Sequence, residues 1–249
     1  MAHGDITHTE IPFDDMQRAM DFYRAVAGWD VQESPEYEGY PMWRAPNQVS
    51  GGGMGRREEG FSTPRFYVEV GSVDDVAARA TELGGRLLQD KDPISDTSWV
   101  AVIADPEGNQ IGLYEGSMPE PVRDTVTMSH GDITHVDIPV TDTRRAQAFY
   151  GDLFGWDIRE VAGFEGYPMW QAPNGALSGG LAPRDASFTQ PRSYIHVDSI
   201  DEALTIAEAN GGRVVQPRQA IDGSSGWAVL EDTEGNEMGV YEQTPATDR

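Results

Sequence analysis

The order of apolar and polar positions in the first half of the chain predicts alternating strands and helices. Residues 6–12 alternate as a strand does, and Asp15 is placed to cap a helix that has Phe22 and Tyr23 on its apolar face. Gly28 is expected to end this helix, because glycine readily adopts the left-handed conformation of a helix terminus. Short strand-like segments follow at residues 29–32, 40–45 and 48–54.

The same order of elements is then predicted a second time. Residues 66–70 have the character of a buried strand, and residues 73–83 form an amphipathic helix that stops at Gly84. Further strands are predicted at residues 86–89, 99–104 and 110–115, with the turn Asp105-Pro-Glu-Gly-Asn109 before the last one. The first half of the chain therefore contains two βαβββ modules.

The second half of the chain repeats the first at an offset of 127 residues. The segment from His3 to His8, HGDITH, recurs from His130 to His135, and EGYPMW at residues 38–43 recurs at residues 165–170. We therefore predict two domains, at residues 1–116 and 129–245. The polar, proline-containing segment 117–128 is predicted to link them.

Composition limits the classes of function. The chain has no cysteine, so thiolate nucleophiles, thiolate metal sites and disulfides are excluded. Its 42 acidic and 18 basic residues give a net charge of −24, which opposes binding to nucleic acid. No apolar run is long enough to cross a membrane and no export signal is recognisable, so we expect a cytoplasmic protein.

The acidic surface has two interpretations. Carboxylates spread along the whole chain are typical of a solvated surface adapted to high salt, where the repulsion between them is screened. Alternatively, part of the negative charge attracts a cationic ligand. We favour the solvated surface.

Several segments together resemble a known family. His8, Asp15, Asp21-Phe22-Tyr23 and Gly28-Trp29 look like the opening strand and helix of glyoxalase-type proteins, and the segment 105–114 looks like their closing hairpin. Each half is thus similar to the glyoxalase/bleomycin-resistance domain of the vicinal oxygen chelate superfamily, which includes dioxygenases. The resemblance implies an α+β fold in which paired βαβββ modules form a half-open barrel around a cavity.

Metal-dependent members of this family hold a divalent ion in the cavity, and the resemblance implies four ligand positions in each copy. His8 and His135 keep the position of the first ligand, fourteen residues before Phe22 and Phe149. The other three positions carry no suitable side chain, because arginine stays cationic and glycine has no donor. These positions fall near Gly51 and Gly179, on Arg65 and Arg192, and on Gly112 and Gly239. We therefore expect no metal cofactor.

A displaced metal site is the alternative. On strands, residues two apart share a face, which places His135, His196 and Glu237 on the faces that would line the second cavity. The matching residues of the first copy are His8, Glu69 and Gln110, a poorer ligand set for a transition metal. A divalent metal is therefore conceivable in the second copy.

The resemblance implies which side chains face each cavity. Those expected to contact a ligand are Glu10, Arg65, Tyr67, Glu69 and Tyr114 in the first copy, and Asp137, Arg192, Tyr194, His196 and Tyr241 in the second. His8 and His135 are the candidates for general bases, because imidazole titrates near neutral pH. Hydrogen-bonded core histidines, and arginines that neutralise nearby carboxylates, are the structural alternatives, and we favour them.

Aromatic residues have similar alternatives. The repeated Tyr40-Pro-Met-Trp43 and Tyr167-Pro-Met-Trp170 segments, with Trp99 and Trp227, either wall an apolar pocket or pack sheet against helix. For Trp29 and Trp156 we predict packing. The glycine runs at residues 51–53 and 179–180 lack the strand-then-helix setting of a phosphate loop, so nucleotide binding is not expected.

Three functions remain. The first is a protein that binds a small organic ligand without metal, as bleomycin-resistance proteins do. The second is a lyase or dioxygenase-like enzyme acting on a small carbonyl or oxygenated metabolite, with a displaced metal or by histidine acid–base chemistry. The third is a structural protein with a vestigial cavity. The duplication supplies internally the pairing of single-domain relatives, so the chain is expected to be a monomeric pseudo-dimer or a homodimer.

Overall fold

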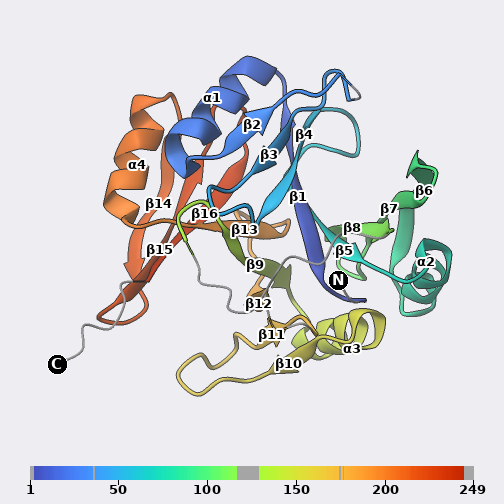
Figure 1. Cartoon of the computed structure of the whole chain (residues 1–249). Coiled ribbons are helices and arrows are strands. Elements are labelled where there is room, and N and C mark those ends of the chain that lie inside the picture. Colours follow the sequence, from blue (N-terminus) through green and yellow to red (C-terminus); the bar gives the residue numbers. More distant parts are fainter. Residues whose placement is uncertain (1–2, 36, 117–128, 174, 176, 244–249) are drawn as a thin grey trace. The chain divides into compact units, whose positions relative to one another are not determined.

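The computed structural model describes residues 3–35, 37–116, 129–173, 175 and 177–243 (Figure 1). The linker predicted at residues 117–128 and the predicted domain end at residue 245 lie outside these ranges. The first copy contains β1 (Ile6–Phe13), α1 (Met16–Ala27), β2 (Asp30–Gln32), β3 (Met42–Arg44), β4 (Gly51–Arg56), β5 (Arg65–Glu69), α2 (Val73–Glu82), β6 (Arg86–Ser95), β7 (Ser98–Ala104) and β8 (Gln110–Glu115).

The second copy repeats this order. Its elements are β9 (Ile133–Val140), α3 (Thr143–Phe154), β10 (Asp157–Arg159), β11 (Met169–Gln171), β12 (Ser178–Pro183), β13 (Arg192–His196), α4 (Ile200–Ala209), β14 (Arg213–Ala220), β15 (Ser225–Glu231) and β16 (Glu237–Gln243). The predicted sequence of βαβββ modules is thus confirmed in both copies.

Each copy forms one open sheet of eight strands. The order is β2-β3-β4-β1-β5-β8-β7-β6 in the first copy and β10-β11-β12-β9-β13-β16-β15-β14 in the second. The first and last strands of each module pair in parallel, as in β1 with β4 and β5 with β8, while the remaining pairs within a module are antiparallel. Neither sheet closes on itself, so the predicted half-open barrel architecture is confirmed.

Two strands differ from the predicted bounds by three or more residues at one end. β4 begins at Gly51 and not at residue 48, because Gln48 has a φ of 65° and the chain turns through a hydrogen bond from Gln48 N to Ala45 O. β6 continues to Ser95, well beyond the predicted end at residue 89. Its pairing with β7 contains register shifts, so a regular alternation of apolar residues does not mark its full length.

The compact units of the chain are not the two copies. One unit combines residues 1–8, 65–126 and 135–191, and the other combines residues 9–64, 127–134 and 192–249. Each unit therefore brings together a module from each copy. Helix α2 packs with α3 in the first unit, and α1 packs with α4 in the second (Figure 1).

A stack of aromatic rings fills the core of each unit. In the second unit Trp29 lies between Tyr23 and Trp43, with ring centroids 4.8 and 3.7 Å apart. In the first unit Trp156 lies between Tyr150 and Trp170, at 5.4 and 3.9 Å. The predicted packing role of Trp29 and Trp156 is confirmed. Trp43 and Trp170, in the repeated hairpins, are each 1% exposed and belong to the same cores, so they do not wall a pocket.

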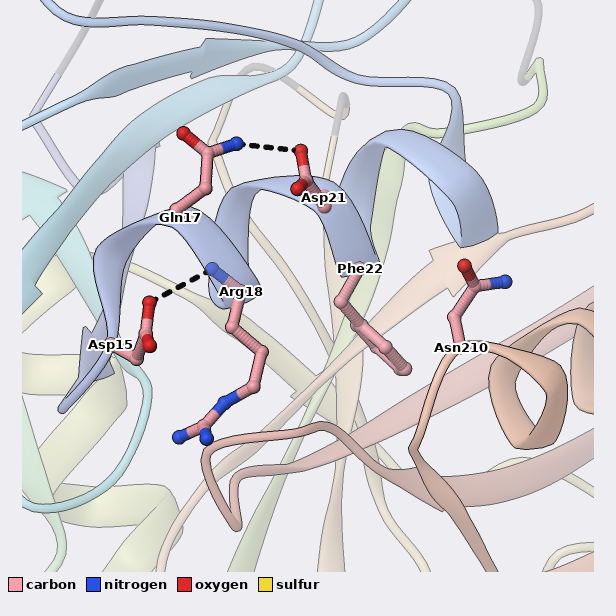
Figure 2. A pocket seen from close by; sticks show the side chains of 6 residues that line it. All are labelled: Asp15, Gln17, Arg18, Asp21, Phe22 and Asn210. Carbon is pink, nitrogen blue, oxygen red and sulfur yellow. Dashed lines mark hydrogen bonds between the residues drawn. The ribbon is translucent and has the colours of Figure 1, made fainter.

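Helix α1 begins where the pattern predicts. The Asp15 carboxylate accepts a hydrogen bond from the backbone N of Arg18, at 3.1 Å (Figure 2). Gly28 ends the helix with a φ of 65°. A pocket of about 360 Å³ lies beside this helix. Figure 2 shows the residues that line it, Asp15, Gln17, Arg18, Asp21, Phe22 and Asn210. Asp21 accepts a hydrogen bond from the Gln17 amide and Arg18 pairs with Glu234, and we assign the pocket no function.

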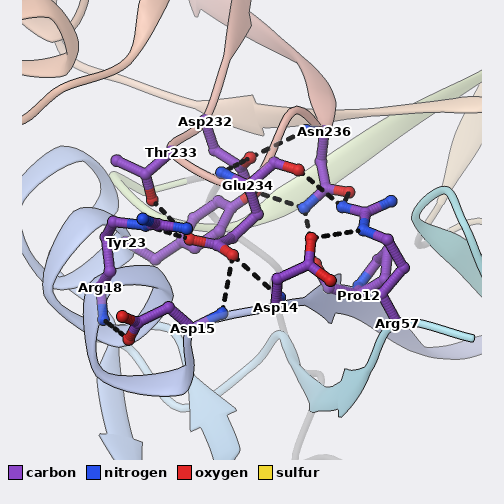
Figure 3. Close-up of polar contacts among 10 residues, drawn as sticks. All are labelled: Pro12, Asp14, Asp15, Arg18, Tyr23, Arg57, Asp232, Thr233, Glu234 and Asn236. Atoms are coloured by element: carbon purple, nitrogen blue, oxygen red, sulfur yellow. Dashed lines mark hydrogen bonds and ion pairs between the residues drawn. The ribbon is translucent and has the colours of Figure 1, made fainter.

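The turn glutamate Glu234 stabilises the start of α1. Its carboxylate accepts hydrogen bonds from the backbone N of Asp14 and of Asp15, at 2.8 and 2.9 Å, and from Arg18 at 2.6 Å (Figure 3). Burial by itself raises the pKa of Glu234, but these hydrogen bonds lower it to about 2. Arg57 completes the arrangement by donating to Glu234 O and to Asn236.

Glu107 does the same for α3 in the other unit. It accepts from the backbone N of Thr141 and of Asp142, at 2.6 and 2.9 Å, and forms ion pairs with Arg145 and Arg184. The turn of one copy thus caps the first helix of the other copy, within each unit. The sequence identified this segment as a turn but not as a cap.

Candidate ligand-binding site

His135, Asp137 and Tyr167 form a polar cluster in the first unit. His135 and Asp137 lie two residues apart on β9, so their side chains share a face. His135 Nε2 is 2.9 Å from Asp137 Oδ1 and 2.8 Å from the hydroxyl of Tyr167, which also donates a short hydrogen bond to Asp137. The predicted general base is therefore held by a carboxylate and a phenol.

The second unit contains a related pair. Tyr40 donates a short hydrogen bond to the Glu10 carboxylate on β1. Glu10 and Tyr40 occupy the positions of Asp137 and Tyr167 at the offset of 127. A tyrosine–carboxylate pair is therefore a feature of both copies.

The sequence did not identify the two tyrosines as polar partners. Their phenol groups lie over Gly53 and Gly180, where a Cβ atom would overlap the ring. The register pairs these glycines with Glu10 and Asp137. The signal in the sequence was the glycine on the neighbouring strand, which leaves room for the ring.

His8 lies against the ring of Tyr67 in the first unit. Its ring stacks on Tyr67 with centroids 4.4 Å apart and planes at 12°, and it meets the edge of Tyr114 at 6.1 Å. His8 Nδ1 is also 2.9 Å from the hydroxyl of Thr7. The Tyr67 ring covers Gly112, its partner on β8, so closely that a Cβ on Gly112 would overlap it.

The equivalent face of the second copy lies in the second unit. There the Tyr194 ring covers Gly239, again its partner in the parallel pair. His196 lies 6.1 Å from the Tyr241 ring, and Trp227 pairs with Tyr241 on the neighbouring strand. Trp99 has a different place, because it pairs with Glu115. The two tryptophans are one residue out of register and do not occupy equivalent positions.

Arg65 and Arg192, at the expected metal positions, each contact the first residue of the last strand of their copy, β8 or β16. Arg65 Nη2 donates to Gln110 Oε1 at 2.7 Å, and Arg192 forms an ion pair with Glu237. Each contact gives the guanidinium group a hydrogen-bond acceptor. The acceptor of Arg192 is Glu237, a residue of the alternative metal site.

Glu69 and His196 occupy equivalent positions and are both buried, with residue exposures of 8% and 7%. Glu69 Oε2 and His196 Nδ1 have no hydrogen-bond partner in the described part of the chain. Burial raises the pKa of the Glu69 carboxyl and lowers the pKa of the His196 imidazole, since each environment disfavours the charged form. Both groups therefore tend toward neutrality.

Comparison with known proteins agrees with this geometry. A model of the glyoxalase-like domain matches residues 9–114, and a model of the bleomycin resistance protein-like N-terminal domain matches residues 132–173. The solved structure of the 2,3-dioxygenase LapB from Pseudomonas sp. KL28 superposes with a TM-score of 0.62 at 13% identity, covering 100% of this chain and 96% of that one. The chain thus carries a glyoxalase-like domain followed by a bleomycin resistance protein-like segment, in tandem as the repeat predicted.

Two relatives match about half of the chain. A glyoxylase-like domain-containing protein of Didymella fabae is 28% identical over 116 residues, which cover 43% of this chain and 90% of that protein. The putative glyoxylase CFP32 of Mycobacterium bovis is 28% identical over 114 residues, covering 43% of this chain but 44% of its own length. These matches concern one domain at a time.

The residues at the superfamily's metal positions do not fit a metal ion. In both copies a tyrosine ring lies against the glycine at the last ligand position, Gly112 or Gly239. Gly179 faces the Trp170 indole, so a side chain there would point into the core, while Ser178 and Gly180 pair with His135 and Asp137. Aromatic rings therefore fill space in which the donor side chains of a metal site would lie.

The described residues also offer no other metal centre. Among residues 3–35, 37–116, 129–173, 175 and 177–243, no group of three or more histidine, aspartate or glutamate side chains is arranged to hold an ion. Within the same ranges, no helix is both long and apolar enough to cross a membrane.

Proposed function

We propose that this vicinal oxygen chelate protein binds a small organic ligand on its tyrosine- and histidine-bearing sheet faces, without the metal centre of its superfamily. The observation that carries the proposal is the pair of tyrosine rings over Gly112 and Gly239. Each ring occupies the space in which the last metal ligand would lie, and the two copies have the same arrangement.

The polar groups on these faces suit recognition of an oxygenated ligand. The His135–Asp137–Tyr167 cluster offers a donor and acceptor array on a rigid strand, and Arg65 and Arg192 offer cationic donors. The Glu10–Tyr40 pair offers a similar array in the other unit. Such groups, set among aromatic rings, are typical of sites that orient a small molecule.

Metal content and ligand binding test the proposal together. Protein purified without chelator and without nickel affinity is analysed by elemental mass spectrometry, then screened by thermal shift against small oxygenated metabolites. We expect far less than one equivalent of divalent metal per chain and at least one compound that raises the melting temperature. One equivalent of metal, lost in His135→Ala but kept in the matched variant His130→Ala, would overturn the proposal.

The His135 cluster also favours a second function. An imidazole held by a carboxylate and a phenol is a suitable general base for proton transfer next to a carbonyl group. Turnover of small carbonyl compounds that is abolished by His135→Ala and reduced by Tyr167→Phe would support this enzyme. Ligand binding without turnover in the parent protein would exclude it for the compounds tested.

We also propose that the two predicted domains, residues 1–116 and 129–245, act in a monomeric chain. Each compact unit already contains a module from each copy, so the helices of one copy find partners in the other. Light scattering at micromolar concentration is expected to give the mass of one chain, 27.3 kDa. A stable mass of twice this value would favour the homodimer.

A further inference from the structure

A pocket of about 630 Å³ lies in the first unit where three strands of the first copy end or begin. Its residues come from the end of β5, the β6–β7 turn, the start of β7 and the end of β8, with His3 beside them. A pocket of this volume can hold a small organic molecule. It is lined by His3, Glu69, Val70, Gly71, Thr97, Trp99, Glu115 and Gly116.

Glu69 supplies a buried carboxyl group to this pocket. The residue is 8% exposed, and its Oε2 atom has no hydrogen-bond partner in the described part of the chain. Leaving a buried acceptor without a donor is costly, and a buried carboxylate without a countercharge costs more. A ligand that brings a positively charged donor would supply a hydrogen-bond partner for this oxygen.

Trp99 and Glu115 already contact an ammonium group of the chain itself, that of Lys91. The Nζ atom of Lys91, the single lysine in the sequence, lies 4.9 Å from the centre of the Trp99 ring. It is 2.7 Å from the Glu115 carboxylate and 3.2 Å from that of Asp74. The indole is partly exposed, and an aromatic ring next to carboxylates is a favourable surface for a cation.

The second copy has lost these features. At the equivalent positions His196 replaces Glu69 and Gly226 replaces Trp99. The guanidinium group of Arg218 lies over Gly226, where a Cβ would be 3.1 Å from Cζ, and it pairs with Glu242. The combination of a buried carboxyl and an indole is therefore specific to the first copy.

We propose that this pocket binds one small organic cation, an amine or a quaternary ammonium compound, with Glu69 as its countercharge and Trp99 as its aromatic wall. The inference goes beyond the proposed function, because this pocket is lined by Glu69 and Trp99 and not by the residues of the His135–Asp137–Tyr167 cluster. The net charge of −24 favours the approach of such a ligand at low salt.

Choline and its uncharged isostere 3,3-dimethyl-1-butanol test the proposal by isothermal titration of the full chain at pH 8 and low salt. We expect one choline per chain and binding of the isostere weaker by about tenfold or more, since the cation–π and charge contributions are lost. Glu69→Gln and Trp99→Phe are each expected to weaken choline binding by a similar factor. The matched variant Trp227→Phe should bind choline like the parent.

Three results would overturn the proposal: no choline binding up to millimolar concentration, equal binding of the isostere, or unchanged binding in Glu69→Gln. Melting curves of each variant show that it is folded before titration. Elemental analysis of the same preparation separates the two hypotheses. A metal-loaded protein that binds choline contradicts the metal-free function alone, whereas a metal-free protein that ignores choline contradicts the cation pocket alone.

Discussion

The ring of Tyr67 lies against the backbone of Gly112, its partner on the neighbouring parallel strand. The same relationship joins Tyr194 and Gly239 in the second copy. Each glycine thus has a packing reason that is independent of backbone conformation. The position at which the resemblance implies a metal ligand is part of an aromatic contact in both copies.

Gly112→Ala is expected to destabilise the protein. The added Cβ would overlap the Tyr67 ring and force it away from His8, at a cost of about 1–3 kcal/mol in the free energy of unfolding. Urea denaturation measures this cost. Gly223→Ala, which has no atom within 4 Å of the new Cβ, serves as the control and should change stability by less than about 0.5 kcal/mol.

A double-mutant cycle makes this prediction specific. In a Tyr67→Ala background the overlap is gone, so Gly112→Ala should cost much less than in the parent chain. Equal costs in both backgrounds would show that the ring is not the reason for the glycine.

Glu234→Gln should weaken the second unit, chiefly above pH 4.5. The pKa of Glu234 is lowered to about 2, so its carboxylate contributes stability that is complete above its ordinary value of 4.5 and is lost as the pH falls toward 2. We expect a loss of about 2 kcal/mol at pH 7 that shrinks in acid. Denaturation at several pH values tests the sign. Glu231→Gln, which removes a more exposed ion pair, should have little effect.

Tyr167→Phe should cost about 1–2 kcal/mol, because it removes a donor from the buried Asp137 carboxylate. Tyr40→Phe should cost a similar amount through Glu10. Thermal and urea denaturation of both variants would be compared with Tyr37→Phe, whose ring is 47% exposed. If all three variants behaved alike, the tyrosine–carboxylate pairs would have no stabilising role.

His196 should make the protein less stable in mild acid. Burial lowers its pKa below the ordinary 6.5, so its contribution to stability is complete above pH 6.5 and is lost as the pH falls through the lowered value. His196→Gln should therefore lose less stability than the parent between pH 7.5 and 5. Parallel pH profiles for the two proteins would contradict the assignment.

Glu69 should have the opposite dependence. Burial and the charge of Asp5 raise its pKa above 4.5, so the stability it contributes is complete below pH 4.5 and is lost as the pH rises through the raised value. Glu69→Gln is expected to raise the melting temperature at pH 8 and to have little effect at pH 4. A variant that is destabilised equally at both pH values would show that the carboxylate is satisfied in the fold.

Much of the local structure followed from the sequence. The Asp15 cap, the Gly28 terminus and the apolar face with Phe22 and Tyr23 define α1 because each depends on residues within one or two turns. The repeat at an offset of 127 predicted that the second copy would have the same elements. The family's metal positions could be tested residue by residue because each is fixed by its spacing from such local features.

Side-chain roles that depend on neighbouring strands were decided by the tertiary structure. The phenols of Tyr40 and Tyr167 contact carboxylates about 30 residues away in sequence, and the glycine on the adjoining strand was the one local sign of these contacts. The burial of Glu69 and of His196, which occupy equivalent positions in the two copies, likewise follows from packing and not from a local sequence pattern.

The sequence by itself predicted a duplicated α+β protein that resembles the vicinal oxygen chelate superfamily, with glycine and arginine at three of the four expected metal positions of each copy. Only the tertiary structure decided which module completes which core. Glu107 and Glu234, in identical turns, each cap the first helix of the opposite copy. Because the two copies present the same capping and core residues, their local sequences favour either pairing equally, and the choice rests on long-range packing of the whole chain.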